Sequence, residues 1–235
     1  MTTPAPDRPA ARAAVAEAEV PGWAGGVMLA LRWATLLVEV TAMVVLGTLA
    51  GGVLLGLGPA LRAGGVVAAR MTAEPTPWRT FWRTWRDGFG RTAALFAPVW
   101  VVGGLLWLDG SALLGGSTLL DGPALLGGSG RAVLTGGLLA VGAWGAVVLA
   151  CWPVVVARYA SGPVATWRFL LLLPLLGPTT SLAVLVVTAA LLAAAWALPL
   201  LAVLVGPGFW LWATGRLAAD RLDRIDAQVS GGPAA

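Results

Sequence analysis

The stretch VMLALRWATLLVEVTAMVVLGTLAGGVLLGLGPALRAGGVVAAR, residues 27–70, decides the fold of this chain. It is almost continuously apolar. One helix crosses a bilayer with about 20 residues, so the stretch is long enough for two crossings. Between Gly51 and Pro59, in GGVLLGLGP, glycines and a proline weaken the helix. The stretch therefore predicts a hairpin of two membrane-spanning helices, near 27–50 and 53–71.

The whole chain shares this apolar character. Of its 235 residues 58% are hydrophobic and 11% charged, whereas soluble domains carry about 25% charge. The composition excludes an ordinary soluble protein and predicts an all-α, polytopic membrane bundle. We expect one transmembrane domain over 23–217, between a disordered cytoplasmic tail (1–22) and a second cytoplasmic tail (218–235). The six expected spans lie near 27–50, 53–71, 92–108, 132–158, 180–198 and 200–216.

The segment WRTFWRTWRDGFGR, residues 78–91, has a different pattern. Its aromatic side chains share one helical face and its arginines another. Such a helix lies in the membrane interface, with its rings at the acyl boundary and its guanidinium groups at anionic headgroups. We expect an interfacial helix over 78–91. The expected membrane or partner surface comprises Trp78, Arg79, Trp82, Arg83, Trp85 and Arg86, with Trp167 and Arg168 from a later segment.

The arginines also predict the orientation. They concentrate in 62–91, in 158–168 and after 216, whereas the loop 109–130 has none. By the positive-inside rule the arginine-rich segments are cytoplasmic, so six spans place both termini inside. A five-span alternative, with 27–57 as one tilted helix, places the N-terminus outside. The bias toward Arg, Ala and Gly indicates a GC-rich bacterial genome, and therefore a bacterial plasma membrane.

An internal repeat favours six spans. Residues 66–79 read VVAARMTAEPTPWR, and residues 154–168 read VVVARYASGPVATWR. Each copy is a helix end, a short loop with a proline, and a Trp-Arg pair that opens the next segment. If both copies face the cytoplasm, the second and fourth spans run in the same direction, as in a parallel repeat. The alternative is a coincidence between segments of low complexity.

The residue types that the chain lacks exclude most kinds of metal, cofactor and catalytic site. The chain has no His and a single Cys, Cys151, so the usual zinc, haem and iron–sulfur sites are not expected. It also lacks the nucleophile elbow, the phosphate-binding loop and the dinucleotide fingerprint. We expect no enzymatic activity, no catalytic residues, no metal and no cofactor. Nucleic acid is not an expected partner, because headgroups and orientation explain the arginines at helix ends.

Two charged residues fall inside expected spans, where charge is costly and often functional. Glu39 lies seven residues after Arg32, and Arg62 lies eight before Arg70. Both are therefore roughly 10–12 Å from those reference residues. If Arg32 and Arg70 lie at the same depth in the membrane, so do Glu39 and Arg62, which then form a candidate intramembrane pair. The pair either lines a polar cavity or only fixes the hairpin, and the second interpretation is favoured because a lone pair is weak evidence for a pathway.

Two segments resemble the YesL-like family of uncharacterised bacterial integral membrane proteins: GLGPALRAG (56–64) and TFWRTWRDGFGRTAALF (80–96). The resemblance extends over about 27–217 and is more specific in the first half. The chain departs from the family in using arginine where lysine is common and in its long Gly- and Ser-rich loop. The matching positions are the Gly-Pro-Ala break at 58–60 and the aromatic residues Phe81, Trp85 and Phe89.

The resemblance implies a role in carbohydrate uptake, because genes of that family often sit beside genes for sugar transporters. No catalytic or binding residues carry over from it. Two functions stay open. The first is an accessory or scaffold component whose partner is a sugar-transporter permease. The second is a small self-contained transporter with a site between the first two spans. A dry packed centre would favour the first and a polar central cavity the second; a homo-oligomer is compatible with either.

Overall fold

The computed structural model describes residues 23–71, 77–115, 128–159 and 162–230, and the expected tail 1–22 lies outside them. All eight helices of this part are α-helices, and six are long and apolar enough to cross a membrane. The predicted fold class, an all-α membrane protein with six candidate spans, is confirmed. The helices are α2 (Trp23–Ala50), α3 (Val53–Arg70), α4 (Pro77–Arg86), α5 (Phe89–Gly115), α7 (Gly128–Arg158), α8 (Pro163–Leu176), α9 (Pro178–Ala197) and α10 (Pro199–Ser230).

Helices α2 and α3 form the expected hairpin, and the chain turns at Gly52. Its φ of 67° is a left-handed conformation that glycine adopts at little cost. The two helices are antiparallel and touch closely. A Cβ atom added at Gly64 would lie 2.4 Å from Val44 Cγ2, and one added at Gly47 would lie 3.3 Å from Ala60 Cβ. These contacts define the register of the hairpin. When a residue of α2 faces a residue of α3, their two residue numbers add up to about 107.

The segment expected as one interfacial helix over 78–91 is divided. Helix α4 ends at Arg86, and α5 begins at Phe89. The break is a tight turn in which the backbone N–H of Gly88 donates to the carbonyl of Arg86 at 2.8 Å. Phe89 therefore starts a membrane-spanning helix that runs to Gly115, beyond the expected span 92–108.

Helix α8 was not expected. Pro163 occupies its first position, where the fixed φ and the missing N–H of proline suit a helix start. Its 14 residues are too few for a full crossing. The segment 218–230, expected as a tail whose mixed-charge start extends the last helix into water, does continue α10, but its residues Ala218 and Leu222 are fully buried.

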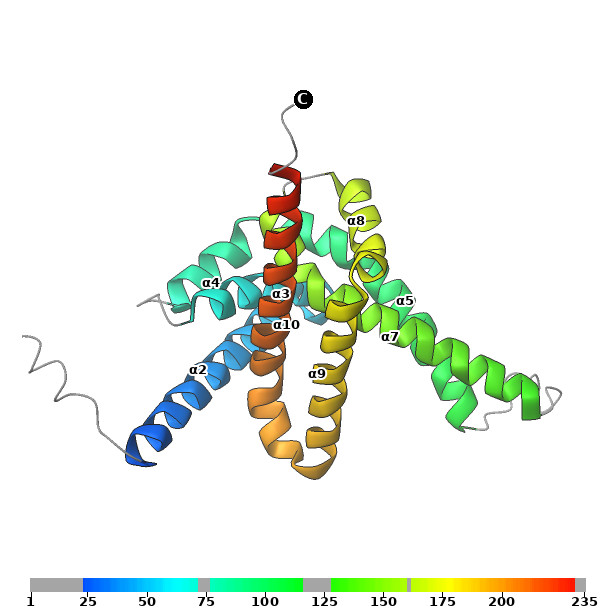
Figure 1. The fold of residues 1–235 in the computed structure, drawn as a ribbon, viewed down its shortest axis with the longest axis horizontal. Coiled ribbons are helices and arrows are strands. Elements are labelled where there is room, and N and C mark those ends of the chain that lie inside the picture. Colours follow the sequence, from blue (N-terminus) through cyan, green and yellow to red (C-terminus); the bar gives the residue numbers. More distant parts are fainter. Residues whose placement is uncertain (1–22, 72–76, 116–127, 160–161, 231–235) are drawn as a thin grey trace, which may run out of the picture.

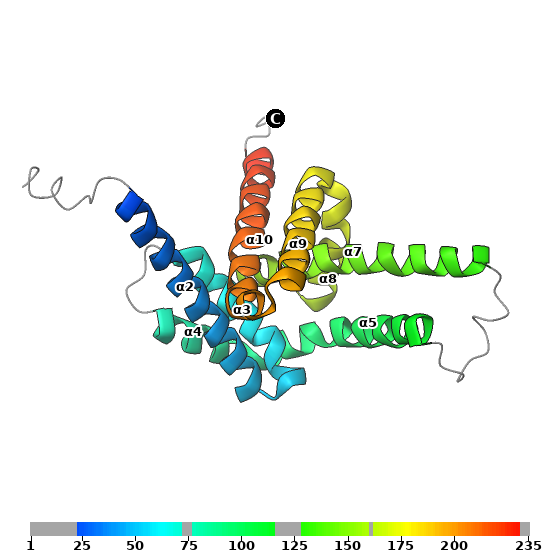
Figure 2. The same cartoon turned by 90° about the horizontal axis from the view of Figure 1, so that it is seen from below.

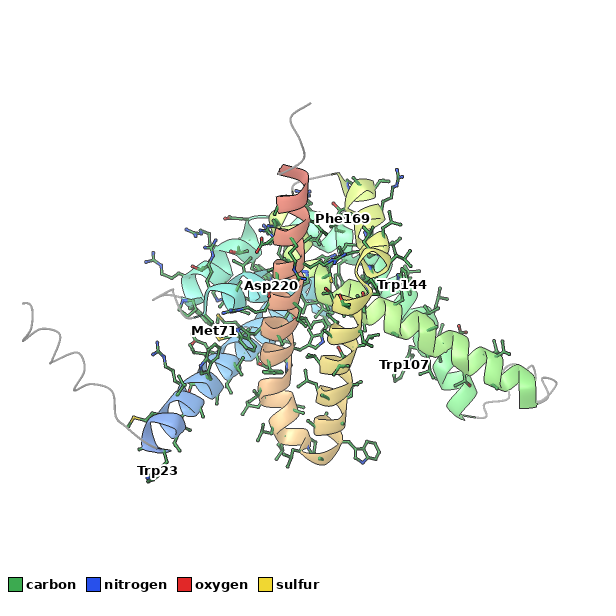
Figure 3. All side chains as sticks on the ribbon, in the orientation of Figure 1. Trp23, Met71, Trp107, Trp144, Phe169 and Asp220 are labelled. Atoms are coloured by element: carbon green, nitrogen blue, oxygen red, sulfur yellow. The ribbon has the colours of Figure 1, made fainter. Side chains whose placement is uncertain are left out.

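The core lies where α3, α7 and α10 contact one another, with α2, α4 and α5 packed around them. From this hub the N-terminal half of α2, the outer halves of α5 and α7, and the α9–α10 hairpin extend as diverging arms (Figure 1; Figure 2). The arms carry mostly carbon-only side chains, and Trp23 and Trp107 lie on two of them (Figure 3). Trp196 is 93% exposed. In a bilayer, acyl chains cover such surfaces.

Candidate functional site

Helix α4 is fastened to the hub by one aromatic residue. Phe81 is fully buried against the α2–α3 hairpin. A Cβ atom added at Gly47 would lie 2.8 Å from the Phe81 Cζ atom, so the glycine makes room for the ring. The neighbouring Thr80 is also buried. The inner face of α4 therefore packs on protein.

The aromatic residues of α4 form a ladder that continues into α5. Ring centroids are 5.7 Å apart for Trp78 and Trp82, 5.4 Å for Trp82 and Trp85, and 4.7 Å for Trp85 and Phe89. Trp82 and Trp85 are half-buried in this ladder and pack against the core, whereas Trp78 is 48% exposed. Trp82 and Trp85 were both expected on the surface; each is partly exposed, and Trp82 lines an open depression beside the arginines of α4. Of these rings, Trp78 is the one most open to a membrane or partner.

The outer face of α4 is cationic. Arg79, Arg83 and Arg86 are all exposed and, with Trp78, border one open depression. Asp87 is the acidic residue in this lining. The structure thus brings together the expected arginines of 78–91 as one basic surface, which we call the α4 basic face (Arg79, Arg83 and Arg86).

Glu39 and Arg62 do not form the expected ion pair. The hairpin register explains why, since Val44 faces Gly64 and Glu39 therefore faces α3 near residues 68–69. Arg62 lies about seven residues from that level, or roughly 10 Å along the helix. The expectation assumed that Arg32 and Arg70 are level, but α2 extends well beyond the end of α3.

Arg62 instead binds the end of α4. Its Nη1 atom donates to the carbonyl of Thr84 at 3.2 Å and lies 3.0 Å from the position of a Cβ atom at Gly88. The last carbonyls of a helix lack intrahelical partners and carry partial negative charge, so a guanidinium group stabilises them. Arg221 of α10 does the same for α8, donating to the carbonyl of Leu176. Each short helix is thus capped by an arginine of a long helix.

Trp167 and Arg168 lie on α8 and have different surroundings. The Trp167 indole N–H donates to the backbone carbonyl of Leu95 in α5 at 3.1 Å, and the ring is half-buried. Arg168 is exposed. Trp167 therefore joins α8 to α5, and of this pair Arg168 is the residue open to the surroundings.

A groove of about 500 Å³ lies between α3, α7 and α10. Each of the three helices contributes one six-residue segment to the groove. In each segment the first, second, fifth and sixth residues line it. The sixth residue is arginine in all three, and the fifth is alanine or glycine. The segments are GVVAAR (65–70), PVVVAR (153–158) and LWATGR (211–216). The internal repeat includes all but the first residue of the first two segments, but the third segment lacks the proline loop and was missed.

The rim of this groove is tied together by polar contacts. Arg158 forms an ion pair with Asp223 of α10. The adjacent Tyr159 donates its hydroxyl to Asp226 at 3.2 Å. Desolvation and this hydrogen bond raise the pKa of the Tyr159 phenol above its ordinary value. The Arg216 guanidinium lies 5.7 Å from the centre of the Trp212 ring, within the range of a cation–π contact. Two consecutive residues at the end of α7 thus hold α10.

One family model matches part of the chain. Residues 37–110 match the model of a protein family of unknown function, DUF624. This DUF624-like region runs from α2 through α3 and α4 into α5, and it includes Glu39, Arg62 and the α4 basic face. No curated protein and no solved structure matches the chain. Two walls of the groove, α7 and α10, lie outside the DUF624-like region.

Proposed function

We propose that this polytopic membrane protein is an accessory or scaffold component of a carbohydrate-uptake system, and that it contacts its partner through the α4 basic face. The observation that carries the proposal is the apolar centre of the hub. Within the described residues, the buried side chains are apolar apart from five threonines and the indole N–H of Trp152, which has no hydrogen-bond partner. A core of this kind can hold helices together but offers no polar path for a solute.

Three of the buried threonines use their hydroxyl protons locally, and the Thr41 oxygen also accepts from the backbone N–H of Gly208 in α10. The hydroxyl groups of Thr41, Thr92 and Thr214 donate to the carbonyls four residues earlier, at 2.9, 2.7 and 2.6 Å. Such bonds satisfy the hydroxyl locally, as is common in membrane helices. Glu39 and Arg62, the residues of the alternative transport site, do not converge. These contacts favour a scaffold over a self-contained transporter.

The α4 basic face is suited to binding because it is fixed while its charges are free to interact. The helix is anchored by Phe81 and capped by Arg62, so its exposed arginines are presented on a rigid element. Pre-organised cations cost little entropy on binding. The link to carbohydrate uptake, and a permease as the partner, rest on the resemblance to the YesL-like family.

A pull-down from native membranes with mild detergent tests this proposal. We expect the unmodified protein to recover a sugar-transporter permease in stoichiometric amount. We expect the variant R79Q/R83Q to lose the permease. The matched control R32Q/R224Q removes the same charge from exposed positions elsewhere, and it should keep the partner. Solute uptake by vesicles that contain this protein alone would contradict the proposal and support the transporter.

A further inference from the structure

The groove between α3, α7 and α10 has the features of a binding site that the proposed function does not use. Three arginines, Arg70, Arg158 and Arg216, line it together with apolar and small residues, and no carboxylate is among the lining residues. They come from helices far apart in the sequence, yet each occupies the last position of an equivalent six-residue segment. Its volume of about 500 Å³ falls within the range of about 300–1,000 Å³ of small-molecule sites.

The charge balance favours an anion. Arg158 is largely neutralised by its ion pair with Asp223. Within the described part of the chain, Arg70 and Arg216 form no ion pair, and both are exposed. The nearby Asp220 follows the lining residue Ala219 but does not itself line the groove. Two cations therefore remain available to one ligand, and guanidinium groups bind phosphate with good geometry.

The floor of the groove is apolar. A Cβ atom at Gly65 would lie 2.8 Å from the Cβ atom of Pro153, so α3 and α7 meet there without a gap. Leu211 is buried beside them, and the Trp212 ring lies under Arg216. A soluble anion would gain nothing from this floor. A ligand with a phosphate and an adjoining hydrocarbon chain would use both the rim and the floor.

We propose that the groove binds the headgroup of an anionic phospholipid, with the phosphate between Arg70 and Arg216 and the start of the acyl region on the apolar floor. Arg70 and Arg158 end two candidate spans, and Arg216 ends the apolar part of α10. Arginines at span ends lie at the level of lipid headgroups, where basic pockets between helices bind anionic lipids.

Native mass spectrometry of the full-length protein tests the charge requirement. The probes are phosphatidylglycerol and phosphatidylcholine added to the detergent-purified protein. We expect one tightly bound phosphatidylglycerol, and at least tenfold weaker binding in R70Q/R216Q. The control R32Q/R224Q removes the same charge from exposed positions outside the groove and the α4 basic face, and it should bind as the unmodified protein does. An equal loss in both variants, or a loss in neither, would overturn the proposal.

A second variant tests where the lipid binds rather than whether binding requires the arginine charges. The nearest atom to a Cβ atom at Gly215 is Val154 Cγ2 at 4.0 Å, so a side chain can start there without a clash, and both residues line the groove. We expect G215L to lose the lipid adduct while keeping every arginine and its melting temperature. Retention of the lipid by G215L would overturn the proposal. Displacement of the lipid by millimolar glycerol phosphate would also overturn it, because it would assign the site to a soluble phosphate.

Discussion

The hydroxyl of Thr41 on α2 accepts a hydrogen bond from the backbone N–H of Gly208 on α10 at 3.0 Å, and it donates to the carbonyl of Leu37 at 2.9 Å. A Cβ atom at Gly208 would lie 2.3 Å from the Leu37 carbonyl oxygen, so the two backbones touch. One buried hydroxyl thus fastens the first described helix to the last.

Replacing Thr41 with valine should destabilise the protein. The change keeps the shape of the side chain but removes the hydrogen bond between the Gly208 N–H and the Thr41 hydroxyl. Interhelical hydrogen bonds in membrane proteins contribute about 0.6–1.7 kcal/mol, which corresponds to a loss of about 2–6 °C in Tm for a chain of this size. Thermal unfolding in detergent measures it. Thr41→Ser keeps the hydroxyl and should unfold closer to the unmodified protein; if T41V unfolds no earlier than T41S, the hydrogen bond contributes nothing.

Removing the Arg62 guanidinium should loosen α4. In Arg62→Leu the carbonyl of Thr84 loses its cap, and we expect amide hydrogen exchange over 77–88 to rise about tenfold, as the loss of a bond to a charged group predicts. The Arg62 Nε atom is buried without a partner, so the same change also removes an unsatisfied group and should lower global stability little. Arg70→Leu is the control and should leave exchange in α4 unchanged. Unaltered exchange in R62L would show that Phe81 alone holds the helix.

The cap of α8 depends on a glycine. A Cβ atom at Gly177 would lie 2.6 Å from Arg221 Nε, so Gly177→Ala should push the guanidinium away from the carbonyl of Leu176. We expect G177A and R221Q to destabilise the protein by similar amounts and the double variant by little more than either. This non-additivity is the signature of residues that share one interaction. Simple additivity in a double-mutant cycle would show that the two positions act independently.

Cys151 should report unfolding. It is 3% exposed within the hub, and a buried thiol is protected from reagents. We expect no modification by a maleimide in the folded protein and complete modification in denaturing detergent. A cysteine introduced at the exposed Arg79, in a chain with Cys151→Ala, should react at once. Rapid labelling of Cys151 in the folded state would mean that the hub opens to solvent.

Features governed by local composition were predictable from the sequence. The apolar lengths predicted the candidate spans, and the glycines predicted the turn at Gly52, since both depend on a few neighbouring residues. Helix α8 was missed because its 14 mostly apolar residues are neither a full span nor amphipathic. The sidedness of the termini stays a prediction.

The details of the candidate sites depended on register and long-range contact. The Glu39–Arg62 pair required α2 and α3 to be level at their ends, and the contact between Val44 and Gly64 shows that they are not. The α4 segment was recognised, but its alternating pattern could not show that Trp85 packs inward against Phe89. The groove could not be predicted, because the composition of LWATGR does not indicate a site. The segment becomes a wall of the groove only when α10 lies beside the other two helices.

The three walls of the groove are synthesised at different times. GVVAAR and PVVVAR leave the ribosome well before LWATGR, so a chain still being inserted has two of the three arginines and no third wall. The same late helix supplies Gly208 for Thr41 and Arg221 for the end of α8. Closure of the bundle and completion of the groove are therefore one event in biogenesis.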